Sequence, residues 1–262
     1  MSISSRMNRI RTAKWYEDYG RALKTEPEII TTNYGWVDLE GKFPELELSA
    51  EEEPSRYPLN LYAFVARRAG IEGKDVLEVG SGRGGGARML TRLFAPASYR
   101  GVDRSLEAIQ SSALRPSQLG LTFVHGDAER LPCEDRTFDV VLSVEAAHAY
   151  GSPDRFLTEA ARVLRPNGTL SLADFGPRAE VVRLTSQLEH HGLRVLESAD
   201  LTPGVVESIR RRQPQVQALA ARLPVPLREP FLAFAAAEGS PIETRLKTRE
   251  TDYFFVLAAK LD

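Results

Sequence analysis

The stretch "VLEVGSGRGGG" (residues 76–86) places five glycines within seven positions, directly after a short apolar run. The apolar run predicts a buried strand, and Gly80, Gly82 and Gly85 follow the G-x-G-x-x-G spacing of a nucleotide-binding turn. Glycine is needed where the chain turns sharply and its backbone approaches a ligand that a Cβ would obstruct. The helix expected after the turn would offer free backbone N–H groups to that ligand.

Composition limits the classes of protein to consider. The chain has 262 residues, enough for one large domain or a core domain with an appendage. Its 34 basic and 36 acidic residues give a net charge of −2, which is not the footprint of a protein that binds nucleic acid or an anionic membrane. Cys133 is the single cysteine, and no His/Asp/Glu spacing suggests a metal site. The first residues lack the apolar stretch of a signal peptide and no apolar run could span a membrane, so a cytoplasmic protein without stable membrane insertion is expected.

From residue 75 to about residue 200, short apolar runs alternate with segments of helical periodicity. Strands are predicted at residues 75–80, 99–103, 121–127, 138–144 and 169–175. Helices are predicted between them, near residues 84–95, 105–113, 153–165 and 178–191. Strands that alternate with helices imply a parallel sheet with helices on both faces. The fold class is therefore α/β, with a doubly wound core.

The segments that flank this core do not show the alternation of strands and helices. Residues 55–71 follow the spacing of an amphipathic helix, and residues 1–70 are predicted to form an N-terminal helical lid or substrate segment. Residues 71–262 then form the core. A helical insertion is expected at about 203–249, followed by a closing strand at 252–260.

Acidic residues mark the ends of two predicted strands. Asp103 ends the second strand, where a ribose with two hydroxyls needs a carboxylate acceptor. NAD and S-adenosylmethionine both carry such a ribose, so Asp103 indicates a nucleoside without choosing between them, and a plain strand-end aspartate stays open. Asp127 ends the third strand, where it can accept from an adenine amino group. Glu78 lies inside the first strand, where a dinucleotide-binding fold usually carries an apolar residue.

In this order, the glycine loop, "HGDAERLPCEDRTFDVVLS" (125–143) and "VLRPNGTLSLADF" (163–175) resemble the class I S-adenosylmethionine-dependent methyltransferases. The resemblance covers about residues 70 to 180, and "TRETDYFFVLAAK" (248–260) suits the last strand of that family. It implies a Rossmann-like seven-stranded sheet, mostly parallel with an antiparallel last strand. It also implies S-adenosylmethionine as the cofactor and methyl transfer by in-line displacement.

The donor-binding residues that the resemblance implies come from several segments of the chain. They are Gly80, Ser81 and Gly82 for the methionine part, Asp103 for the ribose hydroxyls, Arg104, Asp127 and Ala128 beside the adenine, and Ser143 at the end of the fourth strand. Separately from the resemblance, Tyr34 would close over the donor or would simply anchor the N-terminal segment. Glu78 is expected to organise the loop by accepting from backbone N–H groups.

The segment after the fourth strand bears on the methyl acceptor. Methyltransferases that act on base amines carry an Asn/Asp-Pro-Pro-aromatic motif there, whereas this chain has "SVEAAHAY" (143–150), so a nucleic-acid substrate is not expected. This segment, the glycine loop and "NYGWVDLEGK" (33–42) resemble methyltransferases of lipid, polyketide and secondary-metabolite hydroxyls, including the mycobacterial phthiotriol-type enzymes. That resemblance implies an apolar small-molecule acceptor with a hydroxyl. Residues 223–239 would supply an apolar wall of its chamber, or would simply pack as helix.

His148 is the candidate general base, because it follows the fourth strand at the edge where open α/β sheets bind ligands. Glu145 would orient the ring of His148 or contact the acceptor itself. A histidine that only hydrogen-bonds the donor or caps the loop is the plain alternative. Other functions also stay open at this point: an N- or C-methyltransferase, a donor-binding protein that does not methylate, such as a cyclase or regulatory subunit, and an NAD-dependent oxidoreductase.

Overall fold

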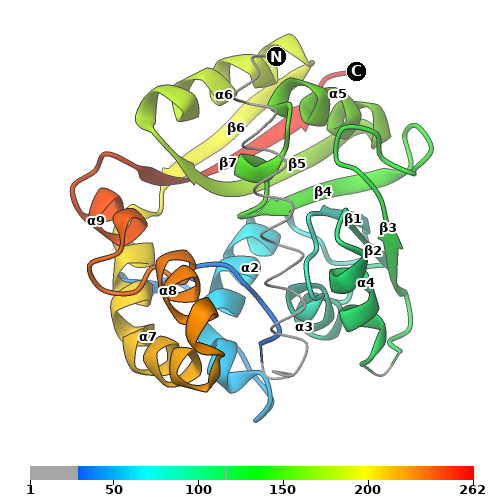
Figure 1. Cartoon of the computed structure of the whole chain (residues 1–262). Helices are drawn as coiled ribbons and strands as arrows, with labels where there is room; N and C mark the ends of the chain where they lie inside the picture. The colour runs from blue at the N-terminus through cyan, green and yellow to red at the C-terminus, as the bar shows by residue number, and fades with distance from the viewer. Residues whose placement is uncertain (1–28, 116) are drawn as a thin grey trace.

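The computed structural model describes residues 29–115 and 117–262, and its centre is one seven-stranded sheet. In space the strands follow the order β3-β2-β1-β4-β5-β7-β6 (Figure 1). Their bounds are β1 (Asp75–Val79), β2 (Ser98–Asp103), β3 (Leu121–His125), β4 (Phe138–Val144), β5 (Leu164–Gly176), β6 (Leu193–Asp200) and β7 (Asp252–Lys260). Strands β1 to β5 pair in parallel, and β7 lies antiparallel between β5 and β6. The predicted Rossmann-like fold class is confirmed.

Helices cover both faces of the sheet. Their bounds are η2 (Glu53–Ser55), α2 (Arg56–Ala69), α3 (Gly85–Phe94), α4 (Leu106–Ala113), η3 (Ala147–Ala149), α5 (Pro153–Val163), α6 (Arg178–His190), α7 (Thr202–Arg222), α8 (Val225–Phe234) and α9 (Pro241–Lys247). One apolar cluster lies between the sheet and helices α2 and α3, and another lies between the sheet and helices α5 and α6. Helices α7, α8 and α9 all lie between β6 and β7 in the chain and form one group beside α2 (Figure 1).

Two strand ends differ by more than one residue from those that the sequence predicts. The third strand stops at His125, and Asp127 lies in the turn that follows, where it forms an isolated bridge with Arg130. The fifth strand begins earlier, at Leu164, since β5 continues through the turn at Asn167, a residue with φ of +62°. Strand edges of this kind depend on neighbours in space, so apolar periodicity alone places them poorly.

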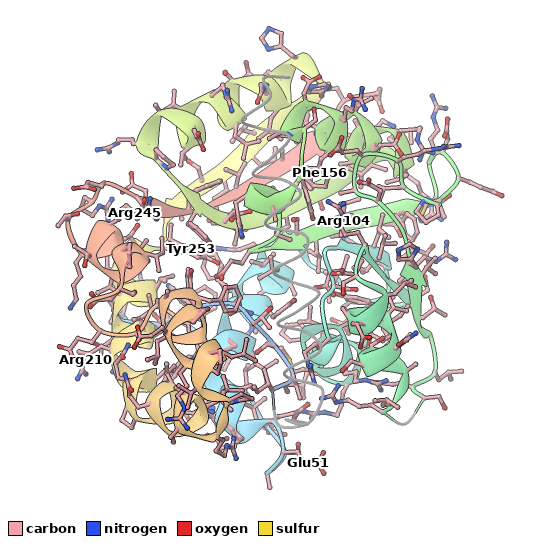
Figure 2. All side chains as sticks on the ribbon, viewed as in Figure 1. Glu51, Arg104, Phe156, Arg210, Arg245 and Tyr253 are labelled. Carbon is pink, nitrogen blue, oxygen red and sulfur yellow. The ribbon has the colours of Figure 1, made fainter. Side chains whose placement is uncertain are left out.

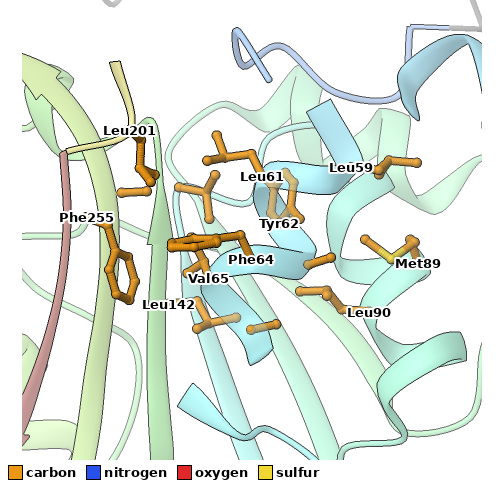
Figure 3. Close-up of a cluster of buried hydrophobic side chains, with 14 of the residues drawn as sticks. Leu59, Leu61, Tyr62, Phe64, Val65, Met89, Leu90, Leu142, Leu201 and Phe255 are labelled. Carbon is orange, nitrogen blue, oxygen red and sulfur yellow. The ribbon is translucent and has the colours of Figure 1, made fainter. Parts of the chain in front are cut away.

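The N-terminal segment is anchored to the core by helix α2. Phe64 and Val65 of this helix face Leu142 of β4 and Phe255 of β7 (Figure 3), and the rings of Phe64 and Phe255 meet edge to face with centroids 5.0 Å apart. Of the helical lid predicted at residues 1–70, residues 1–28 lie outside the described residues, and residues 29–52 contain no helix. The described part of this segment therefore runs extended into a helix of the core.

Close packing around the glycine loop explains one of its glycines. A Cβ at Gly86, in the first turn of α3, would overlap the ring of Tyr62 on α2. Tyr62 is only 6% exposed and its hydroxyl is bonded to Glu78, so the ring has little freedom to move away.

We expect Gly86→Ala to destabilise the protein by about 1–3 kcal/mol, the typical cost of overpacking a well-packed core. Helix propensity alone would predict a gain of about 0.5–1 kcal/mol for the same change. The measurement is the free energy of unfolding in urea. Gly176→Ala is the control, because its added Cβ would make only ordinary contacts, at 3.6 Å from Glu180. A stabilised Gly86→Ala variant would contradict this account of the packing.

Candidate active site

The glycine loop connects β1 to α3 and is tied to the end of β2. The N–H groups of Gly80 and Ser81 both donate to the carbonyl of Val102, at 2.8 and 3.1 Å. The carboxylate of Asp103 accepts the N–H of Gly82 at 2.8 Å and the N–H of Ser105 at 2.8 Å. Burial raises the pKa of Asp103, although these two N–H groups act in the opposite direction. Asp103 thus ties the glycine loop to the residues that follow β2.

The glycines of the loop serve two purposes. Those at 80, 84, 85 and 86 make room for protein, because a Cβ at these positions would overlap Ala146, Phe123, Ile30 and Tyr62 respectively. Gly85 also donates its N–H to the carbonyl of Ile30 at 3.1 Å, so one N–H at the start of α3 is used by the chain itself. Gly82, with φ of +52°, differs: no atom of the described residues lies within 4 Å of where its Cβ would be. Gly82 therefore has the open side that a ligand needs.

The residues predicted to bind the adenine lie where β2 and β3 end side by side. Asp127 accepts the N–H of Glu129 at 3.0 Å, which shapes the turn after β3. Ala128 is buried at 7% exposure, and the carbonyl of Arg104 is bonded to His125 at 3.0 Å. Because β2 and β3 are parallel neighbours, the structure brings Asp103 and Asp127 to the same edge of the sheet.

These features fit a donor with polar groups at this edge. The hydroxyl of Ser81 is buried and has no hydrogen-bond partner among the described residues, which is unusual unless a ligand completes it. Ser143 is fully buried, and its hydroxyl lies 3.2 Å from that of Tyr150, which in turn donates to the carbonyl of Val79 at 2.8 Å. Ser143 is thus linked through Tyr150 to the start of the glycine loop.

His148 is paired with Asp174, a residue that the sequence analysis did not single out. The ring Nδ1 of His148 lies 2.8 Å from one carboxylate oxygen of Asp174, and the backbone N–H of His148 donates to the other at 2.9 Å. Asp174 is only 2% exposed, whereas the side chain of His148 is 26% exposed. A donating Nδ1–H leaves Nε2 of the ring free to accept a proton. Burial lowers the pKa of His148, but the charge and hydrogen bond of Asp174 outweigh it, so the net shift is upward.

Glu145 does not orient the ring of His148, contrary to one expectation from the sequence. One oxygen of its carboxyl accepts the N–H of Tyr34 at 2.9 Å and the hydroxyl of Tyr253 at 2.8 Å. Glu145 has φ of +52° and precedes the short helix η3 that carries His148, so the two side chains share no helical face. Burial raises the pKa of Glu145 to about 8.

Aromatic side chains lie next to His148. The ring of Phe175 lies 4.4 Å from the ring of His148 and 5.4 Å from that of Tyr34. Tyr34 therefore contacts the His148 end of the site, while Ile30 contacts the glycine loop. Arg104 and Tyr253 lie along the same edge of the sheet, one after β2 and the other near the start of β7 (Figure 2).

Glu78 has partners different from those expected. Its two carboxyl oxygens accept the hydroxyls of Tyr62 at 2.8 Å and Tyr99 at 2.9 Å, in place of backbone N–H groups. Strand β1 points this side chain toward α2, away from the loop that follows, which explains the difference. Burial raises the pKa of Glu78 to about 7, although both tyrosine hydroxyls oppose the shift.

Two kinds of feature are absent from the described residues: a metal-binding cluster and a helix that could cross a membrane. No group of three or more His, Cys, Asp or Glu side chains within residues 29–115 and 117–262 is placed to hold a metal ion. In the same part of the chain, no helix has the length and apolar character needed to cross a membrane.

Comparison with known proteins identifies the family. A model described as a methyltransferase domain matches residues 77–172. The chain is 39% identical, over 91% of its length and 88% of the relative's, to a phthiotriol/phenolphthiotriol dimycocerosates methyltransferase of Mycobacterium tuberculosis. It is 37% identical, over 92% and 87%, to a fatty-acid O-methyltransferase of Mycolicibacterium smegmatis. Geranyl diphosphate C-methyltransferase of Streptomyces coelicolor, solved with Mg²⁺, geranyl diphosphate and S-adenosyl-L-homocysteine, is 16% identical with a TM-score of 0.66, over 94% of this chain and 98% of that one.

The fold and the glycine-loop site define an S-adenosylmethionine-dependent methyltransferase. The chain belongs to the family of methyltransferases that includes these two mycobacterial enzymes. The family resemblance, the enzyme class and the cofactor predicted from the sequence are therefore confirmed. The oxidoreductase alternative is set aside, because the relatives are methyltransferases along nearly their whole length.

Glu78 should make the stability of the protein depend on pH. The unfolded carboxyl releases its proton near its ordinary pKa of 4.5, whereas the folded one holds it up to about pH 7. The folded state binds more protons in this window, so stability should fall as pH rises from about 4.5 to 7. In Glu78→Gln this contribution is absent. Urea unfolding across that range should show wild type losing stability relative to the variant. The exposed Glu72→Gln is the control, and a wild-type-minus-Glu78→Gln difference that stays constant with pH would contradict the prediction.

Proposed function

We propose that this enzyme transfers a methyl group to a hydroxyl of an apolar, lipid-like acceptor, with His148 as general base. The observation that carries the proposal is the pairing of His148 with the buried Asp174 at 2.8 Å, which leaves Nε2 available beside the carboxyl ends of β4 and β5. The lipid and fatty-acid substrates in the names of the two relatives support an acceptor of this class.

The donor would bind along the edge formed by β1, β2 and β3. Gly80, Ser81 and Gly82 would hold its methionine part, and Asp103 its ribose hydroxyls. The adenine would lie among Arg104, Asp127 and Ala128, with Ser143 and Tyr34 on the side of the reacting methyl group. When bound, S-adenosylmethionine supplies a methyl group that its positively charged sulfur activates for transfer. The open side of Gly82 and the unpartnered Ser81 hydroxyl support this placement.

His148 would then accept the acceptor's proton at Nε2. Asp174 would hold the ring in one tautomer through Nδ1–H and stabilise the charged ring that results, as the carboxylate of a serine protease triad does. A hydroxyl is a weak nucleophile until it loses its proton, so a positioned base lowers the barrier. The acceptor oxygen must also be aligned with the donor, and the partly buried ring of Phe175 beside His148 would limit how the acceptor can lie.

Glu145 would act as a positioning group at the same site. Its pKa of about 8 keeps the carboxyl mainly protonated at neutral pH. It accepts from Tyr34 and Tyr253 through one oxygen, so the second oxygen can present a proton to an acceptor. We infer that Glu145 holds the N-terminal segment and β7 against the acceptor and contributes a hydrogen bond to it.

A carboxylate acceptor is the second candidate, because one relative is named a fatty-acid O-methyltransferase. A carboxylate is already deprotonated at neutral pH, and therefore it needs no general base. The two acceptor classes make different demands on His148.

We expect His148→Ala to lower kcat for decanol by about 10²–10⁴-fold, the usual contribution of a general base, and to leave decanoic acid much less affected. Donor affinity, measured by calorimetric titration, should be unchanged. Asp103→Ala is the complementary variant and should weaken donor binding by about 1.5–3 kcal/mol, as expected for hydrogen bonds to a charged group. Full turnover of decanol by His148→Ala, or loss of its donor binding, would remove His148 from the role of base.

Asp174→Asn tests the pairing through the pH profile. In wild type, kcat/KM for the alcohol should rise with pH through an apparent pKa above 6.5, because neutral His148 is the active form and Asp174 raises its pKa. Without the carboxylate charge, the imidazolium is less stable, so this rise should move to lower pH. A variant with lower kcat and an unmoved profile would show that Asp174 is only structural.

A further inference from the structure

A second hollow lies outside the edge where the donor is expected. This cavity, of about 420 Å³, lies between residues 29–34, the start of α2 and the insertion helices α7 and α8. No residue of the glycine loop and neither Asp103 nor Asp127 lines it. Voids inside folded domains are usually no larger than a few water molecules, and ligand pockets span about 300–1,000 Å³. The cavity is therefore of ligand size.

Apolar side chains form much of its wall. Pro58, Val216, Leu219, Phe231, Phe234 and Ala235 line it. Val216 and Phe231 belong to a small apolar cluster of their own, separate from the two clusters that pack on the sheet. Helices α7 and α8 thus bury apolar surface against each other, and the cavity lies beside this apolar cluster.

Tyr34 of the N-terminal segment contacts both the cavity and the surroundings of the proposed catalytic residues. Tyr34 lines the cavity, its N–H donates to Glu145, and its ring contacts Phe175, whose ring contacts His148. Asn33 also lines the cavity and accepts a hydrogen bond from Arg212 of α7 at 3.0 Å. Tyr34 and Phe175 therefore connect the wall of the cavity to His148.

We propose that this cavity binds the apolar chain of the acceptor, a single acyl or alkyl chain whose terminal oxygen reaches His148 past Tyr34. The inference rests on the proposed function and specifies its substrate class. With water occupying about 30 Å³ in the liquid, the cavity takes roughly a dozen groups of that size, which matches a medium-length chain. The hydroxyl of Thr31, another lining residue, is buried without a partner among the described residues. A polar substituent on the bound acyl or alkyl chain would give the Thr31 hydroxyl a hydrogen-bond partner.

A bulky side chain in the cavity should prevent the acyl or alkyl chain of the acceptor from binding there. Ala235 lines the cavity at the end of α8, and Ala233, two residues earlier, is exposed and does not line it. Ala235→Trp and Ala233→Trp therefore form a matched pair. Dansyl-labelled undecanoic acid, whose fluorescence rises in apolar surroundings, reports chain binding directly and without methyl transfer. Donor titration shows that each variant is folded, and Leu219→Trp on α7 narrows the same cavity if Ala235→Trp fails that test.

We expect Ala235→Trp to weaken binding of the probe by at least tenfold, and Ala233→Trp to match wild type. For alcohols from hexanol to dodecanol, kcat/KM of wild type should rise by about fourfold per buried methylene, and Ala235→Trp should stop the rise at a shorter chain. Equal probe binding in all three proteins, or no binding in any, would overturn the proposal. Probe binding that Ala235→Trp abolishes, with no methylation of any alcohol or acid, would leave the chain site standing and refute the proposed acceptor chemistry.

Discussion

The buried carboxylate of Asp174 joins the loop after β4 to the end of β5. It is 2% exposed and receives the backbone N–H and ring Nδ1 of His148, together with the N–H of Phe175. A carboxylate buried this deeply is costly unless hydrogen bonds compensate it, so these donors are held in place as firmly as the carboxylate itself. The tautomer of His148 and the position of the Phe175 ring therefore have a common origin. The surroundings of the proposed base depend on this one interaction.

Two further acidic residues connect the neighbouring parts of the site in a similar way. Asp103 accepts backbone N–H groups from the glycine loop and from the start of α4, and Glu145 accepts from Tyr34 and Tyr253. The proposed donor edge, the proposed base and the entrance to the chain cavity are thus each anchored by a carboxyl group. Burial brings the pKa of Glu145 to about 8, so its carboxyl group is mainly protonated at neutral pH.

The antiparallel strand β7 allows these groups to meet. Because β7 runs opposite to β5, its first residues pair with the last residues of β5, and Tyr253 lies opposite Phe175. The insertion between β6 and β7 then returns to the same edge of the sheet, which places α7 and α8 against residues 29–34. The insertion thus leaves and rejoins the sheet at the carboxyl edge of its parallel strands, where open α/β folds bind their ligands.

The sequence by itself determined the features that depend on local pattern. Apolar periodicity and turn residues were enough for the alternation of strands and helices, the glycine loop, and the acidic residues at the end of β2 and just after β3, because these follow from the backbone geometry of neighbouring residues. Only the tertiary structure decided which groups meet. Asp174 stands 26 residues after His148 and Tyr253 stands 108 residues after Glu145. Their pairing depends on strand order, on the positive φ of Glu145 and on the short helix η3. The tyrosine partners of Glu78 could not be predicted for the same reason, because hydrogen bonds between segments far apart in the sequence produce no periodic pattern of residues.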